Sequence, residues 1–233
     1  MKRWGWFVGI TLSMAGVPAG AQPVMGISGG VSSRVLHRGF HRGGSSLSID
    51  GLLASTKRPV TLGVGGSIYR RPDIHFDGYV AATISGKLGE RFSASAGVTG
   101  WAFGPDRPIY GSDQSSRWAG VELVLELARS YGRATTGLNI AYDPQENGGV
   151  ATASISYLTE LWPVLPTTFF AAAGANVSYH IEGVGLSEIT IGGSMEHQTT
   201  TWYVVPHLGL TFAAQEAGRF YYGWVGLAVG RHG

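Results

Sequence analysis

Apolar and polar residues alternate along most of this chain, and that period of two constrains the fold more than any other feature. In Arg117 to Arg129, leucine or valine occupies every second position of Val121 to Leu127, and Glu122 and Glu126 fall between them. A helix would spread such residues around its circumference, whereas a strand sorts them onto two faces. The alternating segments are Val24 to Arg38, Ser46 to Ala54, Pro59 to Tyr69, Phe76 to Leu88, Phe92 to Phe103, Arg117 to Arg129, Ala134 to Asp143, Val150 to Leu161, Phe169 to Ile181, Thr200 to Phe212 and Phe220 to Gly230.

Strands of about ten residues with one apolar face suit a tilted crossing of a lipid bilayer. An open sheet is excluded there, because each unpaired backbone N–H or C=O group in hydrocarbon costs several kcal/mol. The pattern therefore predicts an all-β chain folded as a closed antiparallel up-and-down transmembrane β-barrel.

The strand count must be even in a single-chain bacterial barrel, yet the sequence gives eleven clear strands. We expect the missing strand within Glu182 to Thr199, where apolar and polar residues alternate more weakly. This gives about 12 strands and places both termini on one side of the membrane. The alternative is a barrel of 10 strands, with the first segment left outside.

The connections between strands alternate in length. Short ones are expected at 55–58, 89–91 and 130–133, and longer ones at Arg70 to His75, Gly104 to Ser116, Pro144 to Gly149 and Glu182 to Thr199. Barrels of this type have short periplasmic turns and long outer loops. The N-terminus is therefore expected in the periplasm.

Residues 1–21 have the form of a cleaved secretory signal peptide. Lys2 and Arg3 precede an apolar run that Pro18 ends, and Ala19-Gly20-Ala21 is a small-residue cleavage site. The mature chain, 22–233, is then the outer-membrane β-barrel, and the expected location is the cell outer membrane.

Composition narrows the remaining function classes. Glycine is abundant at 37 of 233 residues, and only 14% of residues are charged, which suits a surface that faces lipid. Cysteine is absent, which removes disulfides and thiolate metal sites. The net charge of +2 gives no basic patch for nucleic acid. No metal site and no cofactor are expected.

Aromatic residues gather near the ends of the expected strands, which favours girdles at the two membrane interfaces. Those assigned to the girdles are Tyr69, Phe76, Phe92, Trp101, Phe103, Trp118, Tyr142, Tyr157, Trp162, Phe169, Phe170, Tyr179, Trp202, Phe212, Phe220 to Tyr222 and Trp224.

The segment VSSRVLHRGFHRGGSSLSIDGLLAS resembles the opening of the TorF-like family of small outer-membrane porins. Ser33, Arg38 and Gly39 match the family's Ser-x-x-x-x-Arg-Gly opening, and a second strand follows at Leu47 to Leu53. The sequence departs from the family at His37 and Phe40 beside the Arg-Gly pair. The resemblance implies a barrel in the outer membrane, more than any particular activity.

The polar faces of the strands would line the barrel interior, and their charged side chains are the candidate site. Opposed cations and carboxylates across a lumen set a field that tunes ion passage. Mutually paired charges in a plugged interior would instead be structural. The tentative pore-lining residues are Arg34, Arg38, Asp50, Asp77, Glu122, Glu126, Asp143, His180 and His207.

We therefore expect a monomeric porin for passive passage of small solutes or ions, and not an enzyme. Its partners would be outer-membrane lipids, lipopolysaccharide and, during insertion, the outer-membrane assembly machinery. One alternative is a non-conducting structural or adhesive barrel that binds partners through outer loops. A second is a lipid-modifying hydrolase, whose parts would come from His37, His41, His75, His180, His197, Ser154 and Asp77. No G-x-S-x-G elbow is present in the sequence.

Overall fold

The computed structural model of this protein is built from strands. It describes residues 24–33, 35–37, 40–43, 45–54, 59–71, 73–103, 119–162, 165–179, 184–213 and 220–231. Within these ranges no helix is long and apolar enough to cross a membrane. The strands are β1 (Val24–Ser32), β2 (Val35–His37), β3 (Phe40–Gly43), β4 (Ser46–Ala54), β5 (Val60–Arg71), β6 (Asp73–Lys87), β7 (Phe92–Phe103), β8 (Ala119–Tyr131), β9 (Ala134–Asp143), β10 (Gly148–Trp162), β11 (Leu165–Val177), β12 (Val184–Met195), β13 (His197–Gln198), β14 (Trp202–Ala213) and β15 (Phe220–Arg231).

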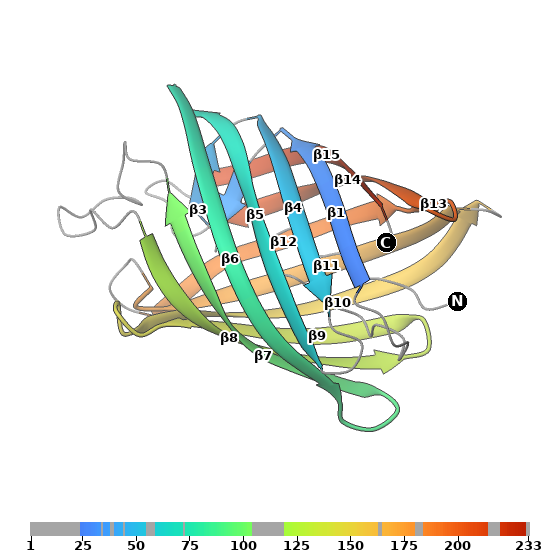
Figure 1. The fold of residues 1–233 in the computed structure, drawn as a ribbon, viewed down its shortest axis with the longest axis horizontal. Coiled ribbons are helices and arrows are strands. Elements are labelled where there is room, and N and C mark those ends of the chain that lie inside the picture. The colour runs from blue at the N-terminus through green and yellow to red at the C-terminus, as the bar shows by residue number, and fades with distance from the viewer. Residues whose placement is uncertain are drawn as a thin grey trace.

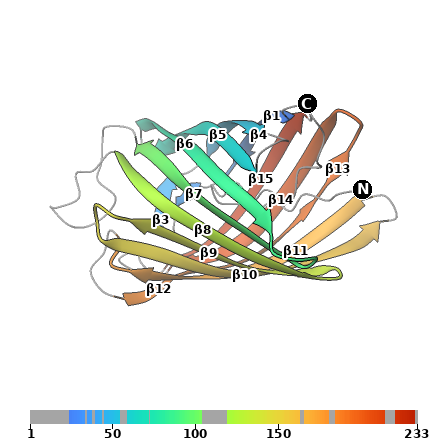
Figure 2. The ribbon, with the colours of Figure 1, turned by 60° about the horizontal axis from the view of Figure 1, so that its bottom comes forward.

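Twelve of the described strands form a closed antiparallel barrel (Figure 1). Strands β4 to β12 pair in chain order, β12 pairs with β14, β14 with β15, and β1 closes the ring between β15 and β4. The strands are tilted relative to the barrel axis (Figure 2). The predicted fold class is confirmed, and the alternative of 10 strands is wrong because β1 pairs on both sides.

The predicted twelfth strand exists as β12, inside the range Glu182 to Thr199. It carries one irregularity, where the pairing with β11 moves from Gly174 opposite Glu188 to Ala175 opposite Leu186. Ser187 is thus the extra residue of a β-bulge, which breaks the strict alternation of the strand. This bulge explains why the sequence pattern is weak here.

The apolar face of each strand points out of the barrel. Ile49 on β4 is 61% exposed, and Leu125 on β8 is 40% exposed, while their polar neighbours on the same strands are more covered. A soluble protein rarely exposes a contiguous apolar surface of more than a few hundred Å². Side chains of this kind surround the barrel: Ile27, Val31, Leu47, Leu62, Val64, Val80, Ile84, Val98, Leu123, Leu127, Ile155, Ile191, Leu208, Leu210 and Val225 are all exposed.

The first predicted strand was too long. Strand β1 ends at Ser32, and β2, in the rest of the segment, pairs with β3 in a separate two-stranded sheet whose register shifts between Val35 and Leu36. The backbone N–H of Ser33 bonds to the carbonyl of Val225, which holds the end of β1 against β15. Apolar and polar residues still alternate after Ser33, but the described residues of this segment no longer pair with the strands of the barrel.

Two predicted long loops are also wrong. The described residues of Arg70 to His75 belong to paired strands, since β5 and β6 stay in register as far as Arg71 opposite Asp73. Pro144 to Gly149 is reduced to a turn at 144–147, with Asn147 at a positive φ of 51°. Polar residues in both segments suggested loops. In the structure, β5, β6 and β10 extend into these segments, beyond the apolar part of each strand.

Both ends of the barrel chain lie on the same side. Because the twelve strands alternate in direction, the start of β1 and the end of β15 share the end of the barrel that holds the connections 55–58, 88–91, 132–133, 163–164 and 196–201. We call this the turn end. The opposite, loop end holds the connections 33–45, 72, 104–118, 144–147, 178–183 and 214–219, and thus the longest ones.

Candidate functional site in the barrel interior

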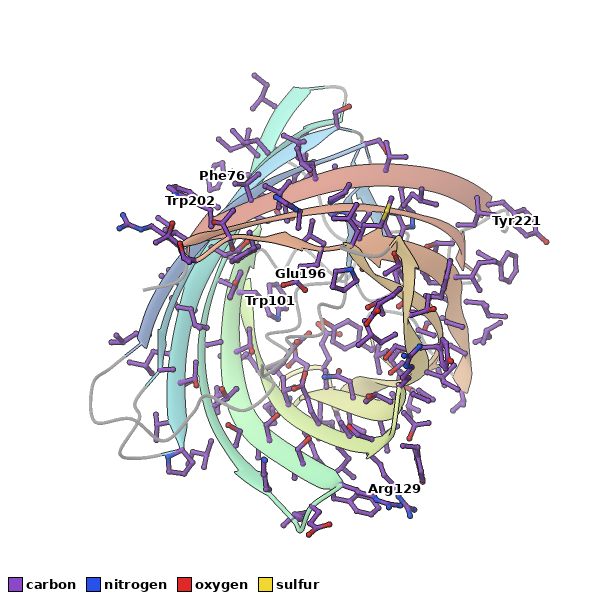
Figure 3. All side chains as sticks on the ribbon, turned by 90° about the vertical axis from the view of Figure 1, so that its right-hand side faces the viewer. Phe76, Trp101, Arg129, Glu196, Trp202 and Tyr221 are labelled. Atoms are coloured by element: carbon purple, nitrogen blue, oxygen red, sulfur yellow. The ribbon has the colours of Figure 1, made fainter. Side chains whose placement is uncertain are left out.

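The polar faces of the strands point into the barrel, where the candidate site lies. Figure 3 shows Trp101 inside the ring of strands, while Phe76, Trp202 and Tyr221 project outward. The inward polar residues that are nearly fully covered are Thr61, Asp77, Glu122, Asp143, Asn176, Ser187 and Thr211.

The structure describes the side chains of six of the nine predicted interior residues, and all six lie on inward-facing positions. Asp77, Glu122 and Asp143 are buried, and Asp50, Glu126 and His207 are half-buried. The side chains of Arg34, Arg38 and His180 lie outside the described part of the chain.

Three of the acids accept hydrogen bonds from tyrosine hydroxyls on other segments. Tyr79 donates to Asp50 at 2.8 Å. Tyr69 donates to Asp77 at 3.1 Å, and Tyr179, which is fully buried, donates to Glu122. A hydroxyl donor stabilises a carboxylate that has lost water. The sequence pattern indicates only the acids, because the tyrosines are brought beside them by strand register and not by sequence spacing.

Glu126 and Asp143 have different neighbours. Glu126 accepts hydrogen bonds from Ser95 at 3.0 Å and from the amide of Asn139 at 2.9 Å, so both adjacent strands hold it. Asp143 accepts from the backbone N–H groups of Gln145 and Glu146, at 2.8 and 3.3 Å. Asp143 therefore stabilises the turn that follows β9, as Asp commonly does at turn positions.

His207 belongs to a cluster with aromatic rings and hydroxyls. Its ring centroid lies 5.8 Å from that of Trp224, and Phe170 stacks on Trp224 at 6.3 Å. The indole N–H of Trp224 donates to Thr211 at 3.0 Å, and Thr211 shares a 2.9 Å hydrogen bond with Thr190. The cluster joins β11, β12, β14 and β15.

Large interior rings lie against glycines on neighbouring strands. A Cβ at Gly209 would come within 2.4 Å of the Trp224 ring, and one at Gly120 within 2.3 Å of Trp101. Each glycine thus leaves the space into which a ring folds along the barrel wall. The same arrangement holds for Tyr79 over Gly65, Phe170 over Gly192, Tyr203 over Gly230 and the His207 imidazole over Gly226. The sequence showed the glycines and the rings, but not that they pair.

The predicted aromatic girdle is only partly correct. Four of the rings assigned to the girdles are buried inside the barrel and do not face lipid, although they lie near strand ends: Tyr69, Trp101, Tyr179 and Trp224. The outward aromatic residues do form two groups: Phe76, Tyr142 and Tyr221 near the loop end, and Phe92, Tyr131, Tyr157, Phe169 and Trp202 toward the turn end. Position along the strand alone could not show on which face each ring falls.

Two described parts of a hydrolase, His75 and Asp77, lie together around Tyr69, which donates a hydrogen bond to Asp77, but Ser154 and His197 do not join them. His75 lies on β6 and stacks on Tyr69 at 5.7 Å, whereas Ser154 lies on β10, with three strands between. His197 is in β13 at the turn end. Among the described residues there is also no group of three or more His, Asp or Glu side chains that could hold a metal ion.

Comparison with known proteins adds little beyond the architecture. No family model matches the chain, and no curated protein matches it. Among solved structures, a bacterial polysaccharide outer membrane secretin is 11% identical, covers 91% of this chain and 99% of its own, and has a TM-score of 0.41. The outer membrane protease OmpT from Escherichia coli is 10% identical, covers 91% and 95%, and has a TM-score of 0.30. At such identities and TM-scores neither activity transfers to this chain, and the closed β-barrel rests on its own strand pairing.

Proposed function

We propose that this protein is an outer-membrane porin that allows passive passage of small solutes or ions. The observation that carries the proposal is the inverted distribution of residues: a closed twelve-stranded barrel with an apolar outer wall and a polar, charged inner wall. The apolar outer wall is suited to contact with lipid, and the polar inner wall is suited to contact with water.

The outer wall supports insertion into a membrane. Nine residues of extended strand reach about 30 Å, and the barrel strands have 9 to 15 residues. This reach matches a tilted crossing of a bilayer. The two outward aromatic groups lie toward opposite ends of the strands, where amphipathic rings settle at membrane interfaces.

The inner wall carries charges at fixed positions. The rings of Trp101, Trp224 and Tyr203 are nearly fully buried against glycines of neighbouring strands. Asp50, Glu122 and Glu126 are held on the wall by hydroxyl and amide donors, so their charges occupy fixed positions. Fixed charges on a pore wall are the elements that set ion selectivity.

Four further parts of the proposal come from the sequence. The signal peptide is removed after Ala21, the turn end faces the periplasm, and the mature chain, a relative of the TorF-like family, works as a monomer. N-terminal sequencing of protein purified from the outer membrane is expected to begin at Gln22. Recovery of a chain that begins at Met1 would contradict export by this route.

Single-channel recording in planar bilayers tests the porin directly. We expect discrete openings from refolded protein, with altered ion selectivity when Asp50 is replaced by Asn. Leu47→Ala, on the outer face of the same strand, is the control and is expected to leave selectivity unchanged. An absence of channel openings from protein that migrates as a folded barrel would favour a non-conducting structural or adhesive barrel. Hydrolysis of phospholipid or lipopolysaccharide by the pure protein would favour an enzyme.

A further inference from the structure

An arginine on the outer wall of the barrel is held between two aromatic rings near the turn end. The guanidinium carbon of Arg129 lies 4.6 Å from the ring centre of Phe92 and 4.5 Å from that of Tyr131. Figure 3 shows Arg129 outside the ring of strands. Cation–π contacts of this kind fix the plane of a guanidinium and leave its edge donors free to bind.

Among the described residues, none of the strand neighbours of Arg129 on this face is a carboxylate. Its partners across the strands are Phe92 on β7 and Thr136 on β9, and its neighbours along β8 on the same face are Leu127 and Tyr131. Its Nε atom is covered and makes no hydrogen bond within the described structure. An arginine without an acidic neighbour is unfavourable in the middle of a membrane and is tolerated at headgroup depth.

Other cations lie at the turn end near the end of β8 that holds Arg129. Lys87 ends β6, Arg91 precedes β7 and Arg133 precedes β9, and all three are exposed. The backbone N–H of Ser130 bonds to the carbonyl of Arg91 at 2.9 Å, so the Arg91 turn lies directly beside the end of β8. Glu90 is the one described acid in these two turns. The positive charge is therefore concentrated over a short stretch of the barrel edge.

From this geometry we infer a binding site for the phosphate of an anionic glycerophospholipid, centred on Arg129 and flanked by Arg91 and Arg133. The guanidinium fork matches two phosphate oxygens, and the exposed rings of Phe92 and Tyr131 supply contacts for the glycerol and upper acyl chain. The inference rests on the proposed membrane location, because the turn end then meets the periplasmic leaflet, which is built from glycerophospholipids.

Native mass spectrometry tests this site on the mature protein released from micelles that contain equal amounts of phosphatidylglycerol and phosphatidylcholine. The wild type is expected to retain phosphatidylglycerol preferentially. Arg129→Gln is expected to lower the ratio of bound phosphatidylglycerol to phosphatidylcholine about fivefold, the effect of one basic residue at a membrane surface. Arg231→Gln, the same change of charge at the same end beside Trp202, is expected to keep the wild-type ratio.

Three results would overturn the site. The first is an unchanged ratio in folded Arg129→Gln, and the second is an equal loss in Arg231→Gln, which would indicate diffuse edge charge. The third is displacement of the lipid by inorganic phosphate at constant ionic strength, which would indicate a site for soluble phosphate. Conductance of the same preparations distinguishes the lipid site from the proposed porin function. Protein that conducts no ions but keeps the wild-type lipid ratio would contradict the porin function alone. Protein that never migrates as a folded barrel contradicts both.

Discussion

At the scale of single residues, pairs of an inward ring and a glycine define the inner wall. The indole of Trp224 occupies the space above Gly209, and the carbonyl oxygen of Ile191 limits the same space from β12, 2.8 Å from where a Cβ would stand. A side chain at Gly209 would thus meet both a ring and a rigid backbone. Glycine here is required by packing, and the high glycine content of the chain has a structural explanation at these positions.

Gly209→Ala is expected to destabilise the barrel by about 1–3 kcal/mol, the usual cost of overpacking. The measurement is equilibrium unfolding of the refolded protein in vesicles or micelles. Gly86→Ala is the matched control, because a Cβ there meets nothing within 4 Å, and it is expected to be neutral or slightly stabilising. Equal stability of the two variants would show that the Trp224 ring does not depend on the gap over Gly209.

At the scale of the strand, the two faces serve different surroundings. Strand β8 alternates outward leucines with the inward acids Glu122 and Glu126, which are held by partners on different segments. The sequence placed both acids on one face, and the structure confirms it. Their hydrogen-bond partners lie on other segments: Asn139 is opposite Glu126 on β9, and Tyr179 follows β11. The pattern of β8 alone indicates neither partner.

The outward face of β8 gives a depth-dependent prediction. Leu125→Arg, near the middle of the strand, is expected to cost about 2–4 kcal/mol of unfolding free energy in a bilayer, because arginine is poorly solvated at the midplane. Leu88→Arg, in the turn after β6, is the control and is expected to cost about 0–1 kcal/mol, as at an interface. Unfolding from lipid vesicles by denaturant measures both. Similar costs would mean that the outer wall does not span the hydrocarbon.

At the scale of the whole molecule, closure depends on contacts between the two ends of the chain. Strand β1 pairs with β15 over Ile27 to Ser32, and with β4 over its full length. This closure leaves no open edge and fixes an even number of strands. It also places the short turns at one end and the longest connections at the other.

The proposed orientation can be tested with single cysteines, because the native chain has none. Gln145→Cys, in the turn after β9 at the loop end, is expected to react with a membrane-impermeant maleimide on intact cells. Arg133→Cys, in the turn after β8, is expected to react only after the outer membrane is permeabilised. Both native side chains are exposed, so access depends on the side of the membrane. The reverse labelling pattern would invert the barrel and move the Arg129 site to the outer leaflet.

The sequence by itself determined the all-β class, most strand positions and the faces of the aliphatic and acidic strand residues, because a period of two is a local property of the backbone. Strands β4, β7 and β9 begin and end where the alternation predicted, and Asp50 and Glu126 point inward as expected. Only the tertiary structure decided where β1 leaves the barrel, which aromatic rings turn inward over glycines, and which tyrosine meets which acid. These features arise from register between strands and from the ring closing on itself, and neither is encoded in the spacing of residues along one strand.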